Sequence, residues 1–357
     1  MITISLCMIV KNEAPVLGRC LDSISNVVDE IIIVDTGSTD ATKTIAKQYT
    51  DLIFDFEWID NFAAARNFSF SKATMDYILW LDADDVIEAL DNNNFVQLKN
   101  ELNSSVDSVT MKYKLAFDEY GNVTLSTRRN RLVKRTNDFR WIGAVHEYLE
   151  VYGNIVNSDV AITHKSISHD NDRNLKIYEK RLQKGEIFSP RDLYYYANEL
   201  FDHKKYKQAA DCYEQFLSEN KGWIEDNISS CGKLADCYHN LNCKALELKA
   251  ILNSFQYDAP RAEFCCRLGY YFLDINNIPA AIDWYKLATQ LEQPKNFQGF
   301  FSPMFSTWLP HLQLCVCYDR IGKYKLAYLH NEAARQYRPD DHNILNNKKY
   351  LEAICNE

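Results

Sequence analysis

The sequence has no run of apolar residues long enough to cross a membrane, which takes about 20 residues in a helix. It also has no excess of positive charge, and its formal net charge of -9 argues against a dedicated nucleic-acid-binding protein, which would need a basic surface. The eleven cysteines form no C-x-x-C pair, and nine of them lie at or after Cys212, in helical patterns where cysteine serves as a small apolar residue. This usage favours a reducing cytoplasm over a disulfide framework.

The first ten residues, MITISLCMIV, are apolar but lack a basic leader and a small-residue cleavage site, so they predict a strand and not a signal peptide. A chain of 357 residues is long for one core, which favours two domains. The patterns described below predict an α/β domain at 1–170, a linking helix at 171–190 and an all-helical domain at 191–357.

Strand-like and helix-like segments alternate in the first half, which predicts βαβ units around a mostly parallel, Rossmann-like sheet. Gly37 permits a tight turn after the second strand, and Ser38 or Thr39 is expected to cap the helix that runs to residue 48. The first helix is expected at 14–28. The expected strands are 2–10, 30–34, 52–58 and 77–81.

The fourth strand ends in acids, in the segment YILWLDADD at 77–85. Open α/β sheets bind ligands at the carboxyl ends of their strands. Carboxylates packed this closely are costly without a cation, and oxygen ligands favour Mg²⁺ or Mn²⁺. We therefore expect Asp82 and Asp84 to form a metal site that holds the phosphates of a substrate.

Polar residues also follow the first two strands, namely Asn12 and Glu13 after the first and Asp35 at the end of the second. A nucleotide fits this arrangement if Asp35 accepts from a base imide and Glu13 from a ribose hydroxyl. Arg66, after three alanines, lies where a backbone could approach phosphate. The alternatives are a helix-capping role for Asp35, a first-turn role for Glu13 and a solvated helix position for Arg66.

Four segments together resemble the successive motifs of family-two glycosyltransferases with the GT-A fold. They are MIVKNE at 8–13, VDTGSTD at 34–40, FAAARN at 62–67 and LDADD at 81–85. The resemblance covers roughly the first half of the chain. It implies a nucleotide-sugar donor, usually a uridine diphosphate sugar, a divalent metal and inversion at the anomeric carbon.

The resemblance also implies roles for single residues. Asp35 would recognise the base, Glu13 the ribose and Arg66 the phosphates. Asp84 would ligate the metal directly, while Asp82 would contact ribose or metal-bound water. The remaining residues expected in the nucleotide-sugar site are Val10, Asn12, Ser38 and Ala83.

Residues expected on the acceptor side follow in GAVHE at 143–147. Inverting transfer needs a base to deprotonate the acceptor and a Lewis acid to stabilise the departing diphosphate. We expect Glu147 to be the base, with His146 as the competing candidate, because G-x-V-H-E resembles a pattern of soluble family-two enzymes with glycan or peptide acceptors. By the same resemblance His164 would be the third metal ligand, with His169 as the fallback. The alternative for His164 is a hydrogen-bonded core histidine.

The segment RRNR at 128–131 supplies positive charge near the expected diphosphate site, or else forms a solvated strand face.

The second half contains helical patterns that recur with a spacing near that of the tetratricopeptide repeat. Small residues such as Ala197, Ala209, Gly269 and Ala281 occupy the positions where paired helices approach closely. Such a stack offers a concave surface suited to an extended peptide. It would either present a peptide acceptor to the sugar site or form a homodimer.

Domain order and motifs together resemble the sublancin-type peptide S-glycosyltransferases. The sequence thus predicts a metal-dependent, inverting hexosyltransferase that moves a sugar from a nucleotide-diphosphate sugar to a peptide or protein side chain. The first alternative is the same chemistry on a lipopolysaccharide or other glycan acceptor. The second is a helical-repeat scaffold with a vestigial sugar-nucleotide site.

Overall fold

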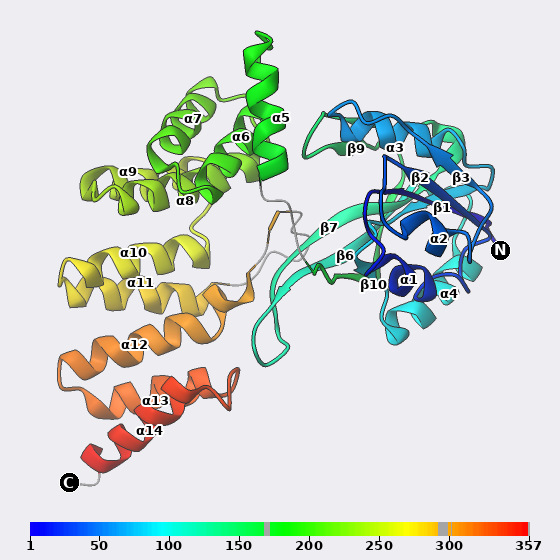
Figure 1. Ribbon diagram of the computed structural model, residues 1–357. Helices are drawn as coiled ribbons and strands as arrows, with labels where there is room; N and C mark the ends of the chain where they lie inside the picture. Colours follow the sequence, from blue (N-terminus) through cyan, green and yellow to red (C-terminus); the bar gives the residue numbers. More distant parts are fainter. Residues whose placement is uncertain (168–171, 292–298, 301, 356–357) are drawn as a thin grey trace. The chain divides into compact units, whose positions relative to one another are not determined.

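The computed structural model describes residues 1–167, 172–291, 299–300 and 302–355. The chain divides into two compact units, Met1–Ile187 with Gln298–Phe301, and Phe188–Phe297 with Ser302–Glu357 (Figure 1). The first unit is built around a large sheet, and the second consists of stacked helices, as the sequence predicted. Among the described residues, no helix is both long and apolar enough to span a bilayer.

The large sheet of the first unit has eight strands. Their order is β3 (Ile53–Asp55), β2 (Glu30–Asp35), β1 (Ile4–Val10), β4 (Tyr77–Trp80), β7 (Val123–Lys134), β6 (Ser108–Phe117), β10 (Ile155–His164) and β5 (Asp85–Val86). The four strands from β3 to β4 run parallel, which confirms the predicted βαβ half. Strand β7 is antiparallel to both β4 and β6. Two short strands, β8 (Arg140–Ile142) and β9 (Tyr148–Glu150), form a separate antiparallel ribbon.

The central strand β1 is buried on both faces, and this explains its continuous apolar sequence. Ile4, Leu6 and Met8 point into one hydrophobic cluster, while Cys7 points into the other. With both faces covered, the polar groups that follow the strand ends emerge at the carboxyl edge of the sheet. This edge carries the candidate site.

Helices α1, α2 and α5 of the first unit are shorter than the sequence pattern suggested. Helix α1 covers only six of the fifteen residues expected at 14–28, because Val16 provides no side-chain cap and turns flank the helix. The helices are α1 (Leu17–Asp22), α2 (Thr42–Ala46), α3 (Phe62–Phe70), α4 (Ala89–Glu101) and α5 (Asp172–Gln183).

The predicted cap of α2 was wrong. Ala41 precedes this helix and makes no side-chain cap. The hydroxyl of Ser38 instead accepts from the backbone N–H of Asn12 at 2.9 Å, and the N–H of Thr39 donates to the Asn12 side chain at 2.8 Å. The two residues therefore join the loops after β1 and β2, where the sequence predicted a nucleotide site.

The second unit is a series of antiparallel helix pairs (Figure 1). Ser189 caps its first helix through a capping box with Asp192, and Pro190 occupies the first turn, where its missing N–H costs nothing. Ala197, Ala209 and Ala281 are fully buried, so the small-residue positions lie where the helices meet. The helices are α6 (Pro190–Asp202), α7 (Tyr206–Glu219), α8 (Ile224–Asn240), α9 (Lys244–Asn253), α10 (Ala262–Asp274), α11 (Ile278–Gln290), α12 (Trp308–Arg320), α13 (Tyr324–Arg335) and α14 (His342–Cys355).

Gly269 marks the tightest of these helix contacts. A Cβ atom at this position would lie 2.7 Å from ring carbons of Tyr285, which is 1% exposed and packed in the core. We expect Gly269→Ala to destabilise the second unit by about 1–3 kcal/mol in urea unfolding, although alanine favours the helix. Gly232→Ala is the control, because its Cβ would meet the Arg267 guanidinium at 3.3 Å. Equal stabilities of the two variants would contradict this account of the packing.

Candidate active site

A metal-ligating group, defined as neighbouring side chains whose atoms are able to ligate a metal ion, lies at the carboxyl edge of the sheet. It consists of Asp84, Asp85 and His164, with one ligand atom from each residue within 4.8 Å of the others. The Nδ1 atom of His164 lies 3.4 Å from Asp84 Oδ1 and 3.7 Å from Asp85 Oδ1. Strand pairing produces this contact, since His164 at the end of β10 lies opposite Asp85 at the start of β5.

The two neighbouring carboxylates change the pKa of His164. Hydrogen bonding to Asp84 and Asp85 raises the pKa of His164 to about 10, and burial opposes the shift only in part. The imidazole is therefore protonated at neutral pH in the metal-free protein. His169, the other predicted ligand, lies outside the described residues.

Asp85 joins this group although the sequence interpretation did not select it. Its carboxylate is fully buried and accepts from Arg131 Nη1 at 3.0 Å, from the Tyr113 hydroxyl at 2.8 Å and from the backbone N–H of Asp82 at 3.0 Å. The last contact closes the turn that presents Asp82 and Asp84. The sequence pointed to Asp85 only through its place beside Asp84 in LDADD. Its contacts with Arg131 and Tyr113, which lie far away in the sequence, could not be predicted from that motif.

Asp82 is separate from the metal-ligating group because its carboxylate pairs with an arginine. Oδ1 of Asp82 accepts from Arg66 Nη2 at 2.6 Å. Burial would raise the pKa of Asp82, but the guanidiniums of Arg66, Arg131 and Arg129 hold it well below its usual range. Asp82 is therefore ionised, and its charge is already balanced.

Arg66 connects Asp82 with the predicted base. While Nη2 donates to Asp82, Nε donates to Oε1 of Glu147 at 2.6 Å. The guanidinium carbon lies 5.0 Å from the ring centroid of Trp80 and 4.8 Å from that of Trp141. A guanidinium held by two carboxylates and two aromatic rings is fixed in position. The sequence predicted that Arg66 contacts the donor phosphates. In the structure, two of its nitrogens donate to these carboxylates instead.

The loop that carries Glu147 and His146 is anchored at both ends. The carbonyl of Ala144 accepts from the N–H of Phe62 at the start of α3 at 2.8 Å. His146 has a left-handed backbone, with φ of 49°, and its ring stacks on Tyr178 of α5 at a centroid distance of 6.4 Å. The two candidate bases therefore have different surroundings, an ion pair for Glu147 and an aromatic stack for His146.

Asp35, predicted to recognise the base of a nucleotide, is 1% exposed, and only one of its two carboxylate oxygens has hydrogen-bond partners among the described residues. Its Oδ1 accepts from the N–H groups of Gly37 and Ser38, both at 2.9 Å, so it organises the turn and does not cap a helix. Its Oδ2 is buried without a hydrogen-bond partner among the described residues. A buried acceptor in this state is costly unless a ligand supplies the donor.

Glu13 shares the electrostatic field of the acids at the end of β4. Burial raises its pKa to about 7, and Asp84 and Asp82 add to the shift. Of the other predicted nucleotide-site residues, Val10 pairs with Asp35 across β1 and β2, and Ala83 is buried between the two acids of the motif. The structure thus gathers the predicted residues at the ends of β1, β2 and β4.

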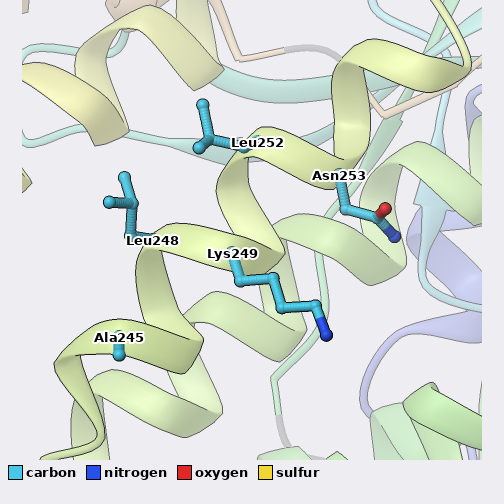
Figure 2. A pocket seen from close by; sticks show the side chains of 5 residues that line it. All are labelled: Ala245, Leu248, Lys249, Leu252 and Asn253. Atoms are coloured by element: carbon cyan, nitrogen blue, oxygen red, sulfur yellow. The ribbon is translucent and has the colours of Figure 1, made fainter.

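The second unit contains a surface depression on helix α9 (Figure 2). It has a volume of about 400 Å³ and is lined by Ala245, Leu248, Lys249, Leu252 and Asn253. Lys249 is the one ionisable side chain among these five, so the depression offers no acid–base pair for transfer chemistry.

Comparison with known proteins finds relatives for both parts of the chain. Residues 5–152 match the family model for glycosyl transferase family 2. A TPR repeat-containing protein from Synechococcus elongatus is 37% identical over 152 residues, which are 42% of this chain and 36% of that protein. The SPbeta prophage-derived glycosyltransferase SunS of Bacillus subtilis is 28% identical over 274 residues, 71% of this chain and 60% of SunS.

The chain therefore spans between about a third and three fifths of these relatives. Among solved structures, a tetratricopeptide repeat protein from Parabacteroides merdae aligns with a TM-score of 0.40 at 14% identity, covering 52% of this chain and 68% of that one.

Proposed function

We propose that this chain, whose residues 5–152 form a glycosyl transferase family 2 domain, transfers a sugar from a nucleotide-diphosphate sugar to a peptide or protein side chain. One observation carries the proposal: Arg66 links the acidic strand end to the base candidate, with Asp82 and Glu147 each 2.6 Å from its guanidinium. This arrangement supports the proposal, because glycosyl transfer requires a base beside the residues that hold the donor.

The donor would bind along the carboxyl edge of the sheet. The free Oδ2 of Asp35 would accept from the imide N–H of a uracil base, and Glu13 would accept from the ribose. Asp84 and His164, with Asp85 behind them, have the donor atoms to hold Mn²⁺ or Mg²⁺. Such a metal ion, when bound, would offset the negative charge of the diphosphate.

The protein side chains would carry the proton transfer. Glu147 would take the proton of the acceptor nucleophile as that atom attacks the anomeric carbon from the face opposite the diphosphate, which inverts the configuration. Arg66 would orient the Glu147 carboxylate through its Nε–H donor. Asp82, which pairs with the same guanidinium, would contact the ribose or metal-bound water.

A peptide acceptor is proposed because a stack of helix pairs suits an extended peptide, and because the similarity to SunS covers 274 residues and so continues beyond the residues that match the family 2 model. The helix pairs of the second unit would present the peptide, and a homodimer through these helices is the competing role. Transfer to a glycan acceptor would use the same base and donor site.

Calorimetry and mass spectrometry test the proposal together. We expect uridine diphosphate to bind only when Mn²⁺ or Mg²⁺ is present, and a nucleotide sugar to add one hexose to a peptide substrate. A chain that binds no nucleotide diphosphate in the presence of metal would be a scaffold with a vestigial site. Transfer to lipopolysaccharide fragments alone would refute the peptide acceptor.

Proton release tests the metal site separately. Hydrogen bonding to Asp84 and Asp85 raises the pKa of His164 to about 10, and a histidine must be neutral to ligate a metal, so Mn²⁺ binding at pH 8 should release about one proton. Affinity for Mn²⁺ should rise about tenfold per pH unit between pH 7 and 9, because protons compete with the metal below that pKa. Calorimetry in two buffers of different ionisation enthalpy measures the release, and His164→Gln should remove it. Binding without proton release would leave the carboxylates as the only ligands.

A further inference from the structure

The three arginines of the segment 128–131 have different surroundings. Strand β7 contains a bulge at Arg131, since Val109 and Thr110 of β6 lie opposite Leu132 and Asn130. Arg131 therefore turns inward, becomes fully buried and pairs with Asp85. Its charge belongs to the folded core and is not accessible to a substrate.

Arg128 is also engaged, on a different part of the sheet. Its Nη1 donates to the backbone carbonyl of Ser158 at 2.9 Å and lies 3.4 Å from the hydroxyl of Thr110. Both partners belong to the neighbouring strands β10 and β6. Arg128 therefore ties strands together and does not face the acids.

The side chain of Arg129, alone of the three, makes no hydrogen bond or ion pair to any residue that the structure describes, although its charge helps to lower the pKa of Asp82. Its guanidinium carbon lies 5.3 Å from the ring centroid of Tyr113. The hydroxyl of Tyr113 contacts Asp85 at 2.8 Å and His164 at 3.0 Å. The side chain of Arg129, which is partly exposed, is thus placed by a ring whose other end touches two members of the metal-ligating group.

Three other cations near this group are already paired. Lys165 follows His164 and pairs with Glu88 at 2.6 Å, and Lys114 follows Tyr113 and lies 3.5 Å from Asp91. Arg66 holds Asp82 and Glu147. A diphosphate carries more negative charge than one divalent ion among carboxylates can balance, so the site needs a further cation. A guanidinium suits it best, because its planar fork matches two phosphate oxygens.

We propose that Arg129 binds the diphosphate of the donor and stabilises the nucleoside diphosphate as it leaves. This assignment rests on the proposed function and adds to it a residue that none of the four family motifs contains. The tyrosine ring beneath the guanidinium restricts its movement without neutralising it. The guanidinium of Arg129 therefore has no ion-pair partner among the described residues and can donate hydrogen bonds to phosphate oxygens.

Calorimetric titration of the full chain with uridine diphosphate and Mn²⁺ tests this assignment. Arg129→Gln should weaken binding of uridine diphosphate by about 10- to 100-fold, as expected for the loss of a charged hydrogen-bond donor. Arg129→Lys should lose less, because lysine keeps the charge but not the fork. Binding of uridine, followed by saturation-transfer NMR, should not change in either variant, and this result would also show that the variants are folded.

Arg128→Gln is the matched control, with the same change of charge one residue away, and should bind uridine diphosphate as the unaltered chain does. Unchanged affinity in Arg129→Gln, or an equal loss in Arg128→Gln, would overturn the assignment while the unaltered chain still binds the nucleotide. Absence of metal-dependent binding by the unaltered chain would instead overturn the proposed function, and the assignment with it.

Discussion

Glu147→Gln should lower the rate of sugar transfer by about 10²- to 10⁴-fold, the usual contribution of a general base. The amide oxygen of glutamine still accepts from Arg66 Nε, so the 2.6 Å contact and the position of the loop are retained. Binding of uridine diphosphate with Mn²⁺ should therefore remain within a few-fold of the unaltered value. Single-turnover transfer measured by mass spectrometry, beside calorimetry of the nucleotide, separates the two effects.

His146→Phe distinguishes the competing base. Phenylalanine preserves the ring that stacks on Tyr178 but has no basic nitrogen. We expect this variant to lose less than tenfold in transfer rate. If His146→Phe were inactive and Glu147→Gln active, the proton acceptor would be His146. Loss of nucleotide binding in Glu147→Gln would mean that this residue holds the site together and does not serve as the base.

Arg131→Met should destabilise the first unit by about 3–5 kcal/mol, because it leaves the Asp85 carboxylate buried without its counter-charge. Both side chains are 0% exposed, and their ion pair is 3.0 Å long. The guanidinium carbon also lies 3.8 Å from the ring centroid of Trp80, so the substitution removes a packing contact as well as a charge. Urea unfolding followed by tryptophan fluorescence measures the change.

The double variant Asp85→Asn with Arg131→Met should recover part of this loss, since asparagine is neutral and its one carbonyl oxygen still accepts either from Tyr113 or from the N–H of Asp82. Arg140→Met is the matched control, because its ion pair with Asp138 is exposed, at 55% and 74% for the two side chains. We expect that control to change stability by less than about 1 kcal/mol. Similar losses of stability in Arg131→Met and Arg140→Met would show that burying the ion pair does not increase its contribution to stability.

Much of the first unit was predictable because its signals are local. Period-two and apolar-run patterns marked β1, β2 and β4, and the acids that follow them needed no distant information to be placed at the carboxyl edge of the sheet. The small residues of the second half marked helix contacts for the same reason. Helix ends were predicted less well, because caps depend on contacts such as that between Ser38 and Asn12 across two loops.

The sequence by itself determined that an α/β domain with an acidic strand end and four family motifs precedes a stack of helix pairs. Only the tertiary structure decided which side chains meet. The antiparallel pairing of β5 with β10 brought His164, near the end of the domain's sequence, to Asp85 in its middle. A bulge turned Arg131 inward to Asp85, and the twin contacts of Arg66 separated Asp82 from the metal-ligating group. Strand register and burial fix these choices, and both arise from contacts between residues far apart in the chain.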